Sequence, residues 1–256
     1  IKNYKKNKNW CELSDKWMLE AFKNRYMYNF SSLGRPIIQT PAEIVALQEI
    51  IWEVKPDLIL ETGIAHGGSL IQSASMLALI DYCEAVEEGK SLNPKDSKRK
   101  VIGLDIDIRE HNRKALETHP MYHKLDLIQG SSIDKETIDL VYEKTKDYKN
   151  ILVCLDSNHT HEHVLKELEA FAPLVSKGSY CIVLDTIIED LPKGFFPDRP
   201  WEVGDNSKTA VWEYLKNLQN KEIKARDGEI LNLVLDKVVE DKLMITVAPD
   251  GFLKRI

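Results

Sequence analysis

The sequence is poor in cysteine, and this excludes the small disulfide-stapled proteins. Its 256 residues include four cysteines, Cys11, Cys83, Cys154 and Cys181, which lie far apart along the chain. This spacing provides neither a disulfide framework nor a zinc knuckle, so it predicts reduced, buried thiols in a cytoplasmic protein. No apolar run reaches the roughly 18 residues that a membrane span needs, and no signal-peptide pattern is visible at the start.

An excess of positive charge is also missing. The net charge of -6 gives no electrostatic footprint for nucleic acid or for an anionic membrane surface, so neither is expected as a partner. Hydrophobic residues make up 43% and charged residues 30% of the chain, which is ordinary for a soluble globular enzyme. The length fits one large α/β domain with a sizeable core.

The stretch 58–70 lacks the common phosphate-binding fingerprints, although it has the layout of a nucleotide site. A short apolar strand ends in Glu61-Thr62-Gly63, and Gly67-Gly68-Ser69 begins an apolar helix predicted to reach about Tyr82. The glycine spacing fails G-x-G-x-x-G, which argues against a dinucleotide. The P-loop spacing is met, but Ser69 stands where that loop needs lysine.

An acid at the strand end remains as the informative feature of this turn. The pattern is acidic-x-Gly-x-x-x-Gly, beginning at Glu61. A carboxylate repels phosphate and attracts a cationic amine, such as the ammonium group of a methionine moiety. This is the motif I pattern of S-adenosylmethionine-dependent methyltransferases, and an ordinary tight βα turn is the alternative. We expect Glu61, Gly63 and Gly67 to hold the methionine end, with Thr62, Gly68 and Ser69 in the same site.

Two further turns are expected to contact the cofactor. The strand 101–104 ends in Asp105-Ile106-Asp107. A carboxylate here can accept hydrogen bonds from both ribose hydroxyls, so Asp105, or else Asp107, is the predicted ribose ligand, with Ile106 beside it. A solvated loop acid is the alternative. Ser131 and Ser132 follow the strand 125–129 and are expected at the adenine edge or at a helix cap.

Strands alternate with helices along most of the chain. This order predicts an α/β fold with a Rossmann-like, seven-stranded, mostly parallel sheet and helices on both faces. Two antiparallel edge strands are expected near 230–238 and 242–247. Residues 1–40 are predicted to form an N-terminal helical extension, with a helix from about Trp10 to Phe30, and residues 41–256 the methyltransferase domain. The loops 34–39 and 187–206 are expected to cover the site.

Several runs of the sequence resemble the cephalosporin hydroxylase family, and together they cover nearly everything from about residue 35 onwards. The most specific run begins at Asp156, directly after a strand predicted at 150–155, and contains His159, His161 and His163. The resemblance implies a Rossmann-like O-methyltransferase that uses S-adenosylmethionine and a divalent metal, with a small-molecule or sugar hydroxyl as the acceptor. The runs are Glu61–Ser69, Gly103–Arg109, Asp156–His163, Asp185–Asp190 and Thr246–Gly251.

The family pattern carries over to the metal site only in part. Asp156 matches the acid after the fourth strand, and Asp185 matches the second acid after the fifth, so these two are the predicted Mg²⁺ ligands, with Asp156 also near the cofactor. The family pattern has glutamate as the first acid of this pair, but this sequence has Leu184 at that position. Asn158 stands where the family often has aspartate. Two carboxylates alone predict weak Mg²⁺ binding.

His159 is the predicted general base for the acceptor hydroxyl, because an imidazole titrates near neutral pH and related methyltransferases place a basic residue there. His161 and His163 have weaker claims. Two alternatives stay open: a non-haem iron hydroxylase, which usually has a jelly-roll fold, and a non-catalytic S-adenosylmethionine-binding protein, which Leu184 favours. The aromatic N-terminal helix favours a homo-oligomer.

Overall fold

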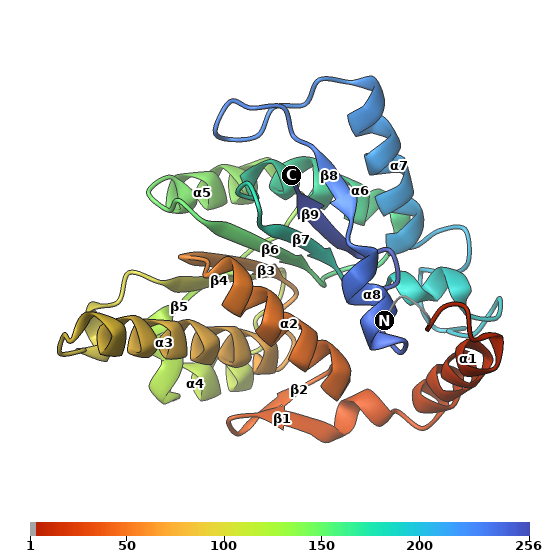
Figure 1. The fold of residues 1–256 in the computed structure, drawn as a ribbon, viewed down its shortest axis with the longest axis horizontal. Helices are drawn as coiled ribbons and strands as arrows, with labels where there is room; N and C mark the ends of the chain where they lie inside the picture. The colour runs from red at the N-terminus through yellow and green to blue at the C-terminus, as the bar shows by residue number, and fades with distance from the viewer. Residues whose placement is uncertain (1–3) are drawn as a thin grey trace.

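Short, buried strands form the centre of the fold, and the computed structural model describes residues 4–256 (Figure 1). The strand order is β5-β4-β3-β6-β7-β9-β8. The first five of these strands pair in parallel, and the last two pair antiparallel, which confirms the predicted mostly parallel sheet. The strands are β3 (Leu58–Thr62), β4 (Lys100–Asp105), β5 (Leu125–Gln129), β6 (Ile151–Leu155), β7 (Tyr180–Val183), β8 (Leu233–Leu235) and β9 (Phe252–Arg255).

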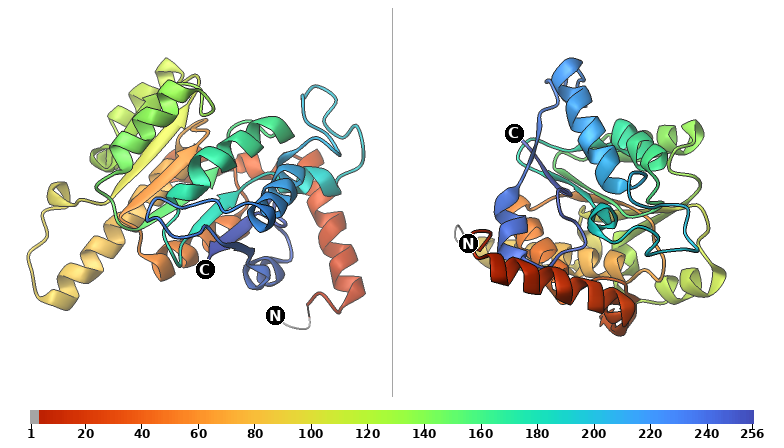
Figure 2. Two further views of the ribbon diagram at one scale, coloured as in Figure 1. Left: turned by 90° about the horizontal axis from the view of Figure 1, so that it is seen from above. Right: turned by 90° about the vertical axis from the view of Figure 1, so that its right-hand side faces the viewer.

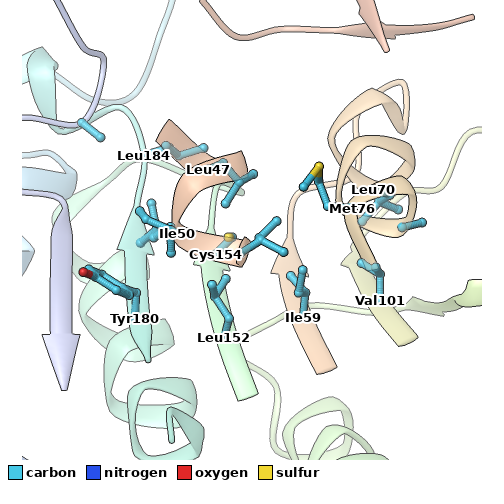
Figure 3. Close-up of a cluster of buried hydrophobic side chains, with 14 of the residues drawn as sticks. Leu47, Ile50, Ile59, Leu70, Met76, Val101, Leu152, Cys154, Tyr180 and Leu184 are labelled. Atoms are coloured by element: carbon cyan, nitrogen blue, oxygen red, sulfur yellow. The ribbon is translucent and has the colours of Figure 1, made fainter. Parts of the chain in front are cut away.

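Helices cover both faces of the sheet because successive strand side chains point to opposite sides. On one face Ile59, Val101 and Leu152 pack against α2 and α3 (Figure 3). On the other face Leu60 and Val153 pack against α5, α6 and α7. The helices are α1 (Lys8–Lys23), α2 (Pro41–Val54), α3 (Gly68–Glu88), α4 (Glu110–Glu117), α5 (Lys135–Thr145), α6 (His161–Phe171), α7 (Ser207–Asn220) and α8 (Lys237–Leu243).

The strand order places a switch point between β3 and β6, because the chain leaves β3 towards β4 and later returns to its other side. Ligands of open α/β sheets bind beyond the carboxyl ends of the strands at such a point. The two strand ends approach each other closely: a Cβ added to Gly63 would lie 2.0 Å from the carbonyl oxygen of Asp156. Glycine is therefore required where β3 gives way to its turn.

The N-terminal segment differs in detail from the prediction. The helix expected to reach Phe30 ends at Lys23, and Arg25 follows in the left-handed region with φ 51°. A short hairpin of β1 (Phe30–Ser32) and β2 (Arg35–Ile37) replaces part of the predicted loop 34–39. Helix α1 lies at one end of the sheet, away from its centre (Figures 1 and 2). The division of the chain at residue 40 stays a prediction.

The C-terminal prediction was wrong for one strand. The segment expected as a strand at 242–247 is the end of helix α8 and the turn after it, and the last strand is β9. Asp236 is the N-cap of α8. Its Oδ1 accepts hydrogen bonds from the backbone N–H groups of Val238 (3.0 Å) and Val239 (3.4 Å), which favours a helix here. Helix α3 also runs to Glu88 rather than about Tyr82.

The four cysteines differ in burial, and none of them forms a disulfide. All four cysteines are free; Cys154 and Cys181 are buried in β6 and β7, whereas Cys11 and Cys83 are partly exposed. Within residues 4–256, no helix combines the length and the apolar character that a membrane crossing requires.

Candidate functional site

A cavity of about 930 Å³ lies beyond the carboxyl ends of β3, β4, β6 and β7. One end is formed by the turn after β3 and by Asp105, Asp156 and Asp185. The other end is formed by residues 22–28 at the end of α1 and by the segment 195–201. We call these the cofactor end and the acceptor end. The predicted covering loops 34–39 and 187–206 both contribute to its wall.

The turn after β3 is shaped by glycines at the cofactor end. Gly63 and Gly67 have φ values of 84° and 80°, a conformation that L side chains rarely adopt. A Cβ on Gly68 would lie 2.2 Å from the carbonyl oxygen of Pro36, so the hairpin packs directly on the start of α3. Gly63, Gly68 and Ser69 line the cavity, and their predicted cofactor contacts stay predictions.

Asp105 lines the cavity and also holds this turn in place. Its Oδ2 accepts hydrogen bonds from the backbone N–H groups of Ile64 (2.7 Å) and Ala65 (3.4 Å). Its Oδ1 accepts one from the N–H of Asp107 at 3.0 Å. Each carboxylate oxygen has two lone pairs, so one lone pair of Oδ1 stays free to accept a hydrogen bond from a ribose hydroxyl. Its predicted ribose role stays a prediction, and its turn-forming role was missed.

Glu61 lies behind the cavity wall. Its Oε1 accepts a hydrogen bond from the hydroxyl of Ser69, which does line the cavity. Glu61 is only 3% exposed, and this burial raises its pKa to about 7, although the Ser69 hydrogen bond opposes the shift. A cationic group close by would stabilise the ionised form of this buried carboxylate, which accepts one hydrogen bond from residues 4–256.

Three side chains that carry metal-ligand atoms converge on the wall of the cavity. One ligand atom from each of Asp156, His159 and Asp185 lies within 4.8 Å of the others. His159 Nε2 lies 3.0 Å from Asp185 Oδ2. The ring of His159 packs edge-on against Trp201, with centroids 4.7 Å apart. The structure thus brings the predicted base together with both predicted metal ligands.

The charges around this group fit a divalent cation. Loss of contact with bulk water raises the pKa of Asp156 well above its ordinary value, and the negative charges of Asp185 and Glu61 add to the shift. A divalent ion would relieve this excess of negative charge, and carboxylate oxygens are its preferred ligands. Leu184 also lines the cavity and offers no ligand atom.

The other two histidines of the run Asp156–His163 lie outside this group. His161 begins α6, and its ring nitrogens contact Thr209 Oγ1 (2.8 Å) and Glu213 Oε2 (3.1 Å) on α7. His163 Nε2 contacts the hydroxyls of Ser132 (3.0 Å) and Ser157 (3.2 Å). Among residues 4–256, one histidine joins the two carboxylates, whereas the facial iron site of an oxygenase needs two.

The remaining predicted cofactor residues lie away from the cavity wall. Ile106 is 71% exposed, and Thr62 is fully buried. Ser132 is buried and engaged with His163. The predicted cofactor contacts of Thr62, Gly67, Ile106, Ser131 and Ser132 stay predictions.

Aromatic and basic side chains at the acceptor end were missed from the sequence. Phe22 on α1 contacts Phe195 and Phe196, with ring centroids 6.2 Å and 5.8 Å apart, so α1 is fixed to the segment 187–206. The guanidinium of Arg199 lies 5.2 Å from the centroid of Trp201. The only signal in the sequence is the set of aromatics between prolines in this segment.

Known proteins resemble this chain in sequence and in fold. A family model described as Rhamnosyl O-methyltransferase/CmcI matches residues 24–256. The Rhamnosyl O-methyltransferase of Mycobacterium tuberculosis is 29% identical over 213 residues, covering 81% of this chain and 71% of that protein. The Mycobacterium leprae protein of the same name is 22% identical over 173 residues, covering 67% of each. A solved structure of CmcI with Mg-SAM is 17% identical, covers 90% of this chain and 77% of that one, and has a TM-score of 0.52.

Proposed function

The chain belongs to the Rhamnosyl O-methyltransferase/CmcI family, and from this premise we propose that it transfers a methyl group from S-adenosylmethionine to a hydroxyl of a sugar or another small secondary metabolite. The family match confirms the resemblance that the motifs indicated. One observation carries the proposal: the Asp156, His159 and Asp185 side chains meet on the wall of a cavity that also contains the glycine turn after β3.

Methyl transfer from a sulfonium is an in-line displacement, in which the acceptor oxygen bonds to the methyl carbon as the carbon–sulfur bond breaks. The protein must align these atoms and remove the proton of the hydroxyl. His159 is the proposed base. Its Nε2 faces Asp185, so Nδ1 is the nitrogen left to take the proton, and Asp185 and Trp201 fix the plane of the ring.

Asp156 and Asp185, with His159 adjacent, are the proposed holders of a divalent cation. A bound Mg²⁺ would lower the pKa of the acceptor hydroxyl and orient it. The relatives support this assignment, since CmcI has been solved with Mg-SAM. Glu61, Gly63 and Gly67 are proposed to hold the methionine end of the cofactor, and Asp105 the ribose.

The acceptor end supports a sugar or another partly apolar ring as the acceptor. Trp201, Phe195 and Phe196 line it, and aromatic faces pack well against the C–H faces of such rings. Arg25, Lys23 and Arg199 add hydrogen-bond donors there. The relatives named Rhamnosyl O-methyltransferase are consistent with a deoxysugar hydroxyl.

The test is methyl transfer from isotopically labelled S-adenosylmethionine to a panel of rhamnosides, other glycosides and phenols, with and without Mg²⁺. We expect a labelled methyl ether and an equal amount of S-adenosylhomocysteine. Trp201→Ala should raise the KM for the acceptor and leave cofactor affinity unchanged. Cofactor binding without transfer to any hydroxyl would instead support a non-catalytic binding protein.

We also propose that the protein acts in the cytoplasm. A second proposal concerns its oligomeric state, which we propose to be a homo-oligomer. Trp10, Leu13 and Trp17 on α1 are 41%, 55% and 38% exposed, and their helical spacing puts them on one side of α1. An exposed apolar strip of this kind supports self-association. Light scattering of the purified chain and of a Trp10→Glu, Leu13→Glu variant tests it, since the variant should be monomeric.

A further inference from the structure

A second, much smaller chamber lies beside the cofactor end of the main cavity. Its volume is about 20 Å³, which is room for one water molecule or one ammonium group. Gln39 and Leu184 line both the chamber and the main cavity, so they form the boundary between the two. The chamber walls contain two carboxylates and no basic side chain; they are Gln39, Glu43, Leu47, Glu61, Cys154, Ile182, Leu184 and Phe252.

The two carboxylates of this chamber differ in how well they are satisfied. Oε2 of Glu43 accepts hydrogen bonds from the backbone N–H (3.0 Å) and the hydroxyl (2.7 Å) of Thr40, and its Oε1 accepts one from the N–H of Val247. Glu61 accepts one hydrogen bond, from Ser69, within residues 4–256. Glu61 is therefore the carboxylate that still needs a donor.

Gln39 provides a second acceptor with the same need. The residue is 5% exposed, and its Oε1 is buried and accepts no hydrogen bond from residues 4–256. Such an orphaned acceptor is costly unless a ligand or a water supplies a donor. A neutral amide adds an acceptor without adding a third negative charge beside Glu43 and Glu61.

We propose that Gln39 is a cofactor-binding residue, and that its Oε1 and the Glu61 carboxylate both accept hydrogen bonds from the α-ammonium group of S-adenosylmethionine. The inference rests on the proposed function and adds a residue to it. An ammonium group has three N–H donors and a positive charge, so it satisfies the orphaned Gln39 Oε1, gives the Glu61 carboxylate a further donor and offsets the buried negative charge. Gln39 follows the β1–β2 hairpin, so this hairpin contributes directly to recognition of the amino-acid end.

The experiment compares two ligands by calorimetry on the full chain. S-adenosylhomocysteine carries the amino-acid end, and 5′-methylthioadenosine lacks it. Gln39→Met keeps the length of the side chain and removes its polar atoms. We expect this variant to bind S-adenosylhomocysteine roughly tenfold more weakly, because it loses a hydrogen bond to a charged group, and to bind 5′-methylthioadenosine as the wild type does. Gln48→Met, on the exposed side of α2, is the matched control and should change neither affinity.

Each other outcome has a definite meaning. Equal losses for both ligands would overturn the proposal, because they would show a general distortion of the site. Unchanged affinity for S-adenosylhomocysteine would also overturn it and would leave the chamber to a water molecule. If the wild type binds neither ligand, the proposed function itself fails, which is a different result from either of these.

Discussion

His159 Nε2 lies 3.0 Å from Oδ2 of Asp185, and the two residues belong to the loops that follow the neighbouring parallel strands β6 and β7. The chain separates them by 26 positions, yet the sheet brings them to one wall of the cavity. Asp185 adopts a left-handed backbone conformation with φ 55°, which is uncommon for a residue other than glycine. Such backbone strain often marks a functional position.

His159→Ala should lower kcat by about 10² to 10⁴, the usual contribution of a general base. The affinity for S-adenosylhomocysteine should stay the same, because the ring packs against Trp201 at the acceptor end. Steady-state rates and calorimetry measure the two effects separately. His161→Ala is the matched control, since that ring is bound to Thr209 and Glu213 outside the cavity, and it should retain the wild-type rate. A wild-type rate for His159→Ala would rule out the base assignment.

Asp156→Asn should have opposite effects on stability and on metal binding. Without metal, the folded site disfavours the ionised form of Asp156, and asparagine has no carboxyl group to ionise, so the free energy of unfolding near neutral pH should rise by about 1 kcal/mol. With Mn²⁺ or Mg²⁺, the stabilisation that the wild type gains should be lost, because one carboxylate ligand is missing. Thermal unfolding with and without each ion tests both statements. An equal gain from metal in variant and wild type would contradict the assigned ligand.

Gly63→Ala should be far more destabilising than another glycine substitution with the same backbone conformation. Gly63 and Gly178 have φ values of 84° and 83°, so alanine at either position is forced into the left-handed conformation. This lowers the free energy of unfolding of both variants by about 1 kcal/mol. A Cβ at Gly63 would also lie 2.0 Å from the Asp156 carbonyl oxygen, whereas Gly178 has nothing within 4 Å. Urea unfolding of both variants should show the difference, and equal losses would argue against the close approach of β3 and β6.

Glu61 should make the protein without cofactor less stable as the pH rises. Burial raises its folded pKa from 4.5 to about 7, so the unfolded chain ionises first. Below pH 4.5 both states are protonated and the penalty is absent; it grows between pH 4.5 and 7 and levels off above that range. Its full size is about 3 kcal/mol, from 1.36 kcal/mol per pKa unit.

The measurement for Glu61 is urea unfolding of the wild type and of Glu61→Gln from pH 5 to 8. The variant should gain stability over the wild type as the pH rises, because glutamine carries no charge to desolvate. The difference between the two proteins isolates Glu61 from Asp156, whose pKa is also raised. A difference that stays constant over this range would mean that Glu61 does not titrate there.

Local patterns were sufficient where one short stretch of chain decides the structure. The capping box of Thr40 and Glu43 begins α2, and both of its hydrogen bonds lie within one turn. The strand–glycine–helix run from Leu58 likewise predicted β3 and α3. The strand predicted at 242–247 failed because the cap at Asp236 favours a helix locally, and strand pairing depends on a distant partner.

The sequence by itself determined the alternation of strands and helices from β3 to β7, the glycine turn and the acids at the strand ends, because hydrophobic periodicity and turn chemistry are written in adjacent residues. Only the tertiary structure decided that His159, rather than His161 or His163, meets Asp156 and Asp185, because α6 begins two residues after His159. It also decided that Asp105 holds the turn after β3 and that Gln39 and Glu61 share a buried chamber. These are contacts between segments far apart in the chain, and their geometry follows from how the sheet and hairpin pack.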